Sequence, residues 1–316
     1  MIYLIFLLSG FTALIYQVAW MKMLSIEFGA TVYAATTVLC VFMMGLALGS
    51  WRFGRRADHT PSPLKLYAKL EGALGAYALA YLVLVSVVHH VYQVIEHTFH
   101  PSYTSFSLIK FVFAFGLLLL PTTLMGGTLP VLCKHLGGGE RGRGRRLGLL
   151  YSFNTFGAML GSIAVSFFLI LALGVRGSIA LAAAINLLLA ATAWWLAKRK
   201  PSHPQSSEAT SDEDVTTVAG PRFQVSTPIV VAFVSGFVIL ASEVLWTRLF
   251  INFLTGNVLI FATVVTAVLA GLTTGGFIAS LLVDRIKHVS VLLVGALHLG
   301  ALSLVLFVVG QTTIAS

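Results

Sequence analysis

Long apolar stretches separated by short polar segments run along the whole chain. Stretches such as 111–125, 179–196 and 289–310 approach or reach the length of about 20 residues that a helix needs to cross the roughly 30 Å of a bilayer core. The pattern therefore predicts an all-α polytopic membrane protein with about nine transmembrane helices. The expected helices cover residues 2–24, 31–51, 66–88, 107–126, 148–173, 177–197, 228–250, 257–282 and 289–310.

Basic residues gather after every second predicted helix, namely after the second, fourth, sixth and eighth. The segments on the other side, including 88–106 and 174–177, hold only Arg176 among Lys and Arg. Because loops rich in Lys and Arg stay in the cytoplasm, the pattern predicts a cytoplasmic N-terminus and a C-terminus outside. We expect a multi-pass protein of the plasma membrane, specifically a bacterial inner membrane.

Composition supports a lipid environment and excludes a soluble protein. The 316 residues are 58% hydrophobic and 10% charged, and a soluble fold could not bury that much apolar surface. The net charge of +9 follows from the basic loops, so it reports topology and not a nucleic-acid surface. The bilayer is the expected partner, and nucleic acid is not.

A polar segment divides the chain into two parts. Residues 199–226 are rich in Ser, Pro and acidic residues and lack apolar periodicity, which is typical of a disordered linker. We therefore expect a six-helix half at 1–198, a cytoplasmic linker at 199–226, and three helices of a partial second half at 227–316.

The two parts share an internal repeat. A shift of 226 residues overlays Ser9-Gly10-Phe11 on Ser235-Gly236-Phe237. The same shift pairs Trp20 with Trp246, Gly45 with Gly271, Gly49 with Gly275, Asp58 with Asp284, and Gln17 with Glu243. A spaced set of this kind predicts that helices 1–3 and 7–9 are parallel repeats.

Four motifs carry a resemblance to a known family: LSGFTALIYQVAWMKML, GLALGSWRFGRRADH, LMGGTLPVL and GLLYSFNTFGAMLGS. In this order they resemble the membrane portion of the fused major-facilitator/spermidine-synthase family, over most of residues 8–197. The resemblance implies a facilitator-type helical bundle followed by a cytoplasmic aminopropyltransferase-like domain.

The features of that second domain are missing from this sequence. The one Gly-rich turn with an acidic end, at 136–140, lies in a short basic loop with no strand before it. We therefore expect no aminopropyl transfer by this chain alone and no cofactor. A complete facilitator has two sets of six helices, so we expect either a truncated chain or a membrane or synthase-like partner subunit that completes the second half.

Polar residues within the predicted spans are the candidate substrate ligands. Glu243 and its repeat partner Gln17 would lie on opposite walls of a central cavity in a facilitator arrangement, where they would suit a cationic amine. The alternative is that Glu243 bonds a neighbour and only locks helix packing. Asn154 and Glu71 are further candidates, although interhelical packing for Asn154 and an interfacial position for Glu71 are the simpler interpretations.

The segment after the second helix resembles the facilitator signature loop, with Trp51 in place of its Asp and Ala47 in place of its first Gly. The candidate gating residues are Arg52, Arg55, Arg56 and Asp58, with Asp284 and Arg285 in the second repeat. Charges in such a loop can pair with neighbouring helix ends and hold one face closed. The alternative is a plain cytoplasmic anchor.

Two further features are expected to be structural. Glycines spaced by four, at 45 and 49, 157 and 161, and 271 and 275, predict close helix contacts.

In the outer loop, Val91, Val94 and Ile95 predict a helix lying along the membrane interface. His97 and His100 could meet on one face of it, but no second cluster completes a metal site, so no metal is expected.

Two functions remain open from the sequence. The first is a transport-type module that moves or presents a small cationic, polyamine-like metabolite. The second is a non-transporting scaffold or accessory subunit of a larger membrane complex.

Overall fold

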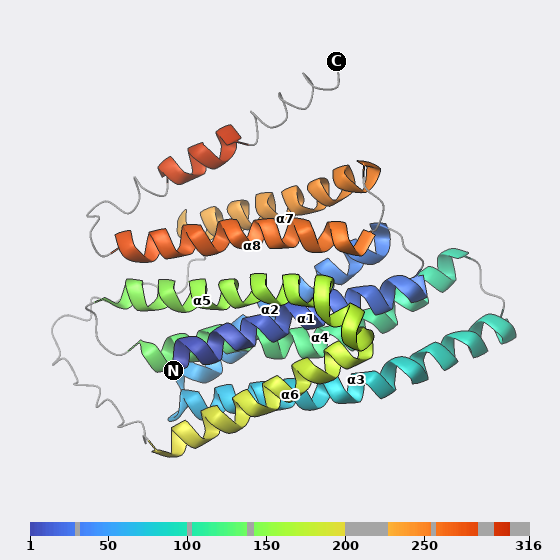
Figure 1. The fold of residues 1–316 in the computed structure, drawn as a ribbon, viewed down its shortest axis with the longest axis horizontal. Coiled ribbons are helices and arrows are strands. Elements are labelled where there is room, and N and C mark those ends of the chain that lie inside the picture. Colours follow the sequence, from blue (N-terminus) through green and yellow to red (C-terminus); the bar gives the residue numbers. More distant parts are fainter. Residues whose placement is uncertain are drawn as a thin grey trace, which may run out of the picture.

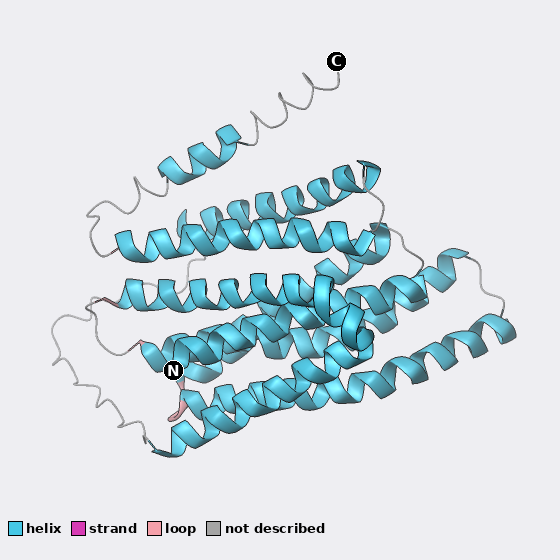
Figure 2. Ribbon diagram, in the orientation of Figure 1, coloured by secondary structure: helices cyan, strands magenta, loops and turns pink. Residues whose placement is uncertain are grey.

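All regular structure in the described part of the chain is helical (Figure 2). The computed structural model describes residues 1–28, 32–99, 103–137, 142–199, 227–253, 257–283 and 294–303. The helices are α1 (Ile2–Phe28), α2 (Val32–Asp58), α3 (Pro63–Phe99), α4 (Tyr103–Leu136), α5 (Arg143–Ala164), the π-helical segment η1 (Val165–Leu169), α6 (Ile170–Arg199), α7 (Thr227–Phe253) and α8 (Asn257–Leu282). A short apolar helix follows at Val294–Ser303.

Seven helical stretches within these ranges are long and apolar enough to cross a membrane. One of them, Arg143–Arg199, contains 57 residues, and at about 1.5 Å per residue it would measure roughly 85 Å if it were straight. It reverses direction at Gly174, where φ is 69° and ψ is 176°, so that α5 and α6 lie antiparallel (Figure 1). The sequence predicted a break between helices 148–173 and 177–197, and that prediction is confirmed.

The all-α, multi-pass prediction is thus confirmed, while the count of nine helices is not established. The ninth predicted helix, at 289–310, is described only over Val294–Ser303. The predicted linker lies outside the described residues except for Arg199, which is the last residue of α6. The division into six and three helices stays a prediction.

Helix α3 corrects one expectation. We predicted an amphipathic helix along the interface after residue 88, but α3 continues unbroken to Phe99. No Gly or Pro occurs between Ser86 and Phe99 to end the helix. In this part of α3, Tyr92 packs edge-on against Phe113 of α4 with ring centroids 5.4 Å apart, while Val94 is half exposed.

The first six helices form two sets of three with matching contacts. Helix α1 packs against α5 and α6, α2 packs against α4, and α3 packs against α4 and α6. This pattern is unchanged when α1, α2 and α3 are exchanged with α4, α5 and α6. Since α1 and α4 run in opposite directions (Figure 1), the two sets are an inverted repeat.

Helices α7 and α8 add to one side of this bundle. Helix α8 packs against α5, and the main neighbour of α7 is α8 (Figure 1). Large apolar side chains of α7, including Phe233 and Phe237, are mostly exposed. The described residues therefore leave most of the α7 surface without a protein neighbour.

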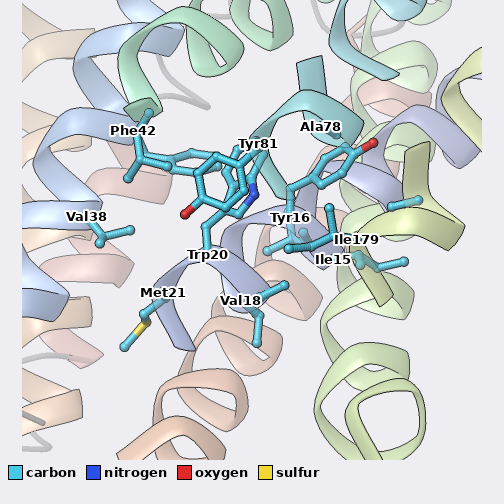
Figure 3. Close-up of a cluster of buried hydrophobic side chains, with 14 of the residues drawn as sticks. Ile15, Tyr16, Val18, Trp20, Met21, Val38, Phe42, Ala78, Tyr81 and Ile179 are labelled. Carbon is cyan, nitrogen blue, oxygen red and sulfur yellow. The ribbon is translucent and has the colours of Figure 1, made fainter. Parts of the chain in front are cut away.

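An aromatic cluster fills the centre of the first six helices (Figure 3). The rings of Tyr16 and Trp20 on α1 stack with centroids 5.0 Å apart, and Trp20 also contacts Tyr81 of α3 at 5.2 Å. Phe42 of α2 lies at the edge of the cluster, 6.2 Å from Trp20. Side chains from three helices thus occupy the middle of this half.

Small residues set the closest helix contacts, as predicted, at four of the six glycines. A methyl group added to Gly45 or Gly49 of α2 would overlap with Thr122 or Thr123 of α4. The same group on Gly157 or Gly161 of α5 would overlap with the carbonyl oxygens of Leu7 and Phe11 on α1.

The prediction was wrong for Gly271 and Gly275 of α8 within the described residues. Nothing lies within 4 Å of a Cβ built at either glycine. The reason is their helical position: α8 faces α5 through Gly276 and Ser280, so the two glycines point elsewhere.

Candidate functional site

A buried carboxylate joins three helices of the first bundle. Glu71 of α3 has no exposed surface. The Ser9 hydroxyl of α1 donates a hydrogen bond to Glu71 Oε1 at 2.6 Å, and the Asn186 amide of α6 donates to Oε2 at 2.7 Å. Tyr16 of α1 in turn donates to Asn186 Oδ1 at 3.4 Å. These four side chains form what we call the Glu71 network.

The helical register of α3 explains why Glu71 is buried. Tyr67, Leu74 and Ala78 are four residues before it and three and seven residues after it, which places all four on one helical face. All of them are buried. Lys69 is two residues away and therefore lies near the opposite side, where it is exposed. The expectation of an interfacial Glu71 was wrong because proximity in sequence to Lys69 says nothing about its face.

The network is closed, which indicates a structural role. Among the described residues no Lys, Arg or His forms an ion pair with Glu71, and its two oxygens instead accept the two side-chain bonds above. Both donors are buried, so the network presents no open face to a ligand. Asn186 of α6 joins that helix to α3 through Glu71 and to α1 through Tyr16. Ser9 and Tyr16 were not among the candidate site residues from sequence, although they share one of the recognised motifs with Gln17.

Gln17 and Glu243 are buried but differ from Glu71 in their surroundings. Gln17 of α1 is 7% exposed and Glu243 of α7 is 8% exposed. Neither side chain forms a hydrogen bond or ion pair with another described residue, although Thr247 donates to the main-chain carbonyl of Glu243. Helices α1 and α7 are not a packed pair, because α1 packs mainly on α5 and α6, and α7 on α8. The predicted arrangement across a cavity therefore stays a prediction.

Asn154 lies at the close contact between α5 and α1. Its Oδ1 would be 2.9 Å from a Cβ built on Gly10, so the absent side chain of Gly10 leaves room for the amide. Asn154 is half-buried there. This position next to the α1 main chain favours the packing interpretation of Asn154.

The candidate gating residues are distributed around the end of α2. Asp58 forms an ion pair with Lys134 of α4 at 3.4 Å, and both side chains are well exposed. The Arg55 guanidinium lies 4.7 Å from the ring centroid of Trp51, the residue that replaces the signature Asp. Arg52 and Arg56 are exposed, and Asp284 and Arg285 lie outside the described residues. The ion pair therefore joins α2 to α4, and the Arg55–Trp51 contact lies within α2.

In the predicted outer segment, the histidines that the structure describes do not gather into a metal site. His97 is exposed near the end of α3, and His100 lies outside the described residues. No group of three or more His, Cys, Asp or Glu side chains in the described ranges is arranged to hold a metal ion.

A polar seam joins α5 to α8, and sequence reasoning missed it. The Thr266 hydroxyl of α8 donates to Ser162 Oγ of α5 at 3.1 Å, and Ser162 donates to the Ala262 carbonyl at 3.4 Å. Farther along, Phe153 packs edge-on against Phe277 with ring centroids 5.5 Å apart. The available signal was a face of small residues on α5 at positions 148, 152 and 162.

Comparison with known proteins gives one family match for this chain. A family model described as Major Facilitator Superfamily matches residues 138–316, which is more than half of the chain. The match begins before α5 and includes α6, α7 and α8. No curated protein and no solved structure matched the chain.

Proposed function

Because the chain belongs to the major facilitator superfamily and is a multi-pass membrane protein of transporter type, we propose that it moves a small cationic, polyamine-like metabolite. Glu243 is the proposed ligand of an ammonium group, and Gln17 is the proposed second ligand. The observation that carries the proposal is that the buried Glu243 carboxylate has no polar partner among the described side chains.

The Glu243 carboxylate lies within the candidate span Ile229–Thr247, where a charge is costly. An ionisable group there is unfavourable unless another charge or a set of hydrogen bonds compensates it. Glu71 meets that condition through Ser9 and Asn186. Glu243 does not meet that condition through the described residues. A cationic substrate would therefore supply the compensating charge.

Gln17 extends the proposal to a second contact. Its amide oxygen can accept a hydrogen bond from an ammonium group, and its side chain also lacks a bond to a described residue. Gln17 is held next to Tyr16, whose ring stacks on Trp20, so its helix is firmly placed. A rigid α1 would hold Gln17 in a fixed position against the bound amine.

The polyamine class is proposed from the resemblance stated above. The four motifs behind it lie on α1, α2, α4 and α5, the two closely packed pairs α1–α5 and α2–α4. A diamine or polyamine is also the kind of substrate that a carboxylate and an amide can bind together. We also propose that a synthase-like domain, either linked to this chain or on a separate subunit, acts together with it.

Completion of the second half is the proposed role of a partner subunit or of further helices. Gly45 and Gly49 of α2 pack on α4, and their repeat partners Gly271 and Gly275 of α8 face open space. By the repeat, a helix equivalent to α4 would cover these two glycines. Such a helix would also cover apolar surface near α7.

The test is transport by the purified chain in proteoliposomes, with labelled spermidine as the probe. Glu243→Gln is expected to reduce flux at least tenfold, since it removes the charge but keeps the size of the side chain. The matched control is Glu208→Gln, which removes one negative charge from the predicted linker and is expected to leave flux unchanged. Unchanged flux in a folded Glu243→Gln protein would rule out Glu243 as the ligand.

The open glycine face of α8 favours a second candidate, a scaffold that presents this surface to another membrane subunit. In that case the wild-type chain shows no flux of any small amine, and Gly271→Leu blocks assembly with the partner while Glu243→Gln has no effect. Flux by the wild-type protein would decide for transport.

A further inference from the structure

A strongly basic pocket opens where α2 ends and α3 begins. Its volume is about 710 Å³, and six basic side chains line it. They are Arg52, Arg55, Arg56, His59, Lys65 and Lys69. The lining contains no acidic residue.

The nearest acidic residue in the sequence does not neutralise these charges. Asp58 pairs with Lys134 and lines a separate pocket beside α4 and α5. The start of α3 adds to the positive field, because the N-terminal end of a helix carries a partial positive charge. Ser62 and Pro63 form this start, and the amides of Lys65 and Leu66 bond to the Ser62 carbonyl. The pocket is thus an anion site by its charge and by its helix end.

An apolar groove adjoins the pocket along α3 and α6. Its volume is about 450 Å³, and Ala68, Ala190, Ala191, Trp194 and Trp195 line most of it. Lys69 lines both the pocket and the groove. The two tryptophans are partly exposed, and tryptophan is enriched where the hydrocarbon region meets the headgroups. The groove therefore has the lining expected at the depth where an acyl chain begins.

We propose that the pocket and the groove together bind one anionic phospholipid. The phosphate and the rest of the headgroup occupy the basic pocket, an acyl chain lies along the alanines and tryptophans of α3 and α6, and Lys69 sits at the junction. Basic pockets between transmembrane helices are suited to anionic headgroups. A soluble phosphate would satisfy the charges but would leave the groove without a function, so the combination favours a lipid. This inference does not depend on the transported substrate.

The headgroup test measures lipid retention by native mass spectrometry of the full chain in detergent, with phosphatidylglycerol and phosphatidylcholine as probes. The wild-type protein is expected to retain phosphatidylglycerol in preference. Lys65→Gln with Lys69→Gln is expected to weaken that binding about tenfold or more, because each basic group near an anionic headgroup contributes to binding. Both lysines are exposed, so the fold should persist.

The matched control is Arg143→Gln with Arg145→Gln. These exposed arginines carry the same charge at the same end of the bundle, but they lie outside the basic pocket. The control pair is expected to keep the wild-type preference. Equal losses in the two double variants would show a general surface charge effect and overturn the site.

The groove test separates a lipid from a free phosphate. Ala191→Trp fills the groove from an exposed position and leaves every charge in place. It is expected to weaken phosphatidylglycerol retention several-fold while the lysines remain. If inorganic phosphate displaced the lipid at comparable concentration and Ala191→Trp had no effect, the site would bind phosphate and the lipid proposal would fail.

Discussion

Glu71 shows how a carboxylate can be accommodated in a helical bundle without a basic partner among the described residues. Ser9 and Asn186 supply one donor to each of its oxygens, and Asn186 is itself oriented by Tyr16. Because an unsatisfied buried polar group is costly, each member of such a network depends on the others. The side chains of three helices are therefore coupled through one residue.

Glu71→Gln is expected to lower the free energy of unfolding by about 1–3 kcal/mol, because an amide offers one acceptor oxygen to two donors. Unfolding in detergent, followed by circular dichroism, measures the change. Thr192→Val on α6 is the control: its exposed hydroxyl bonds only to the Leu188 carbonyl of its own helix, so the change should stay within about 0.5 kcal/mol. Similar effects of the two variants would argue against the network.

At the scale of single helices, glycine position decides which pairs approach closely. Gly157 and Gly161 let α5 meet the main chain of α1, and Gly45 and Gly49 do the same for α2 and α4. In lipid, such close packing replaces much of the hydrophobic driving force available in water. The same spacing on α8 meets no neighbour in the described residues.

Gly157→Ala is expected to destabilise the protein by about 1–3 kcal/mol, since the added methyl overlaps with the Leu7 carbonyl oxygen. Gly271→Ala is the matched control in the isolated chain: it meets open space and is expected to be neutral or to gain up to about 1 kcal/mol from helix propensity. Thermal unfolding of both variants gives the comparison. Equal tolerance at the two sites would contradict the observed α1–α5 contact.

The reversal between α5 and α6 depends on one backbone conformation. Gly174 has φ 69° and ψ 176°, a region open almost only to glycine. Gly174→Ala is expected to cost about 1–3 kcal/mol although no atom lies near the added methyl. Gly116→Ala in α4, which also meets open space, should not destabilise the protein. A harmless Gly174→Ala, seen as an unchanged melting temperature, would count against this turn.

At the scale of the whole molecule, the α5–α8 seam is the main contact of α7 and α8 with the first six helices. The hydroxyl pair Ser162 and Thr266 and the ring pair Phe153 and Phe277 lie along it. Helix α7 reaches the bundle mainly through α8. Movement of the second part relative to the first would therefore have to occur at this seam.

A cross-link tests the seam. In a background without Cys40 and Cys133, Ser162→Cys with Thr266→Cys should form a disulfide, because the two hydroxyl oxygens are 3.1 Å apart. With a protease site inserted in the predicted linker, the two fragments should stay joined on a gel until they are reduced. Ser162→Cys paired with Thr274→Cys, an exposed position on α8, should not link. Separation of the fragments in the first variant would show that α5 and α8 do not meet there.

The sequence by itself determined the membrane environment, the all-α class and the break between residues 173 and 177. Apolar length and the placement of basic residues are local properties of a segment, and a helix in lipid must satisfy its own main chain. The close contacts at Gly45, Gly49, Gly157 and Gly161 were also predictable from spacing, although their partner helices were not.

Only the tertiary structure decided which polar residues are already satisfied and which surfaces are open. Glu71 was predicted to be interfacial, yet it is enclosed by residues 62 positions before it and 115 positions after it. The basic pocket likewise joins the α2–α3 turn to a groove formed with α6. A hydrophobicity pattern shows that a segment is buried in lipid or protein, but the face that meets another helix depends on residues far away in the chain.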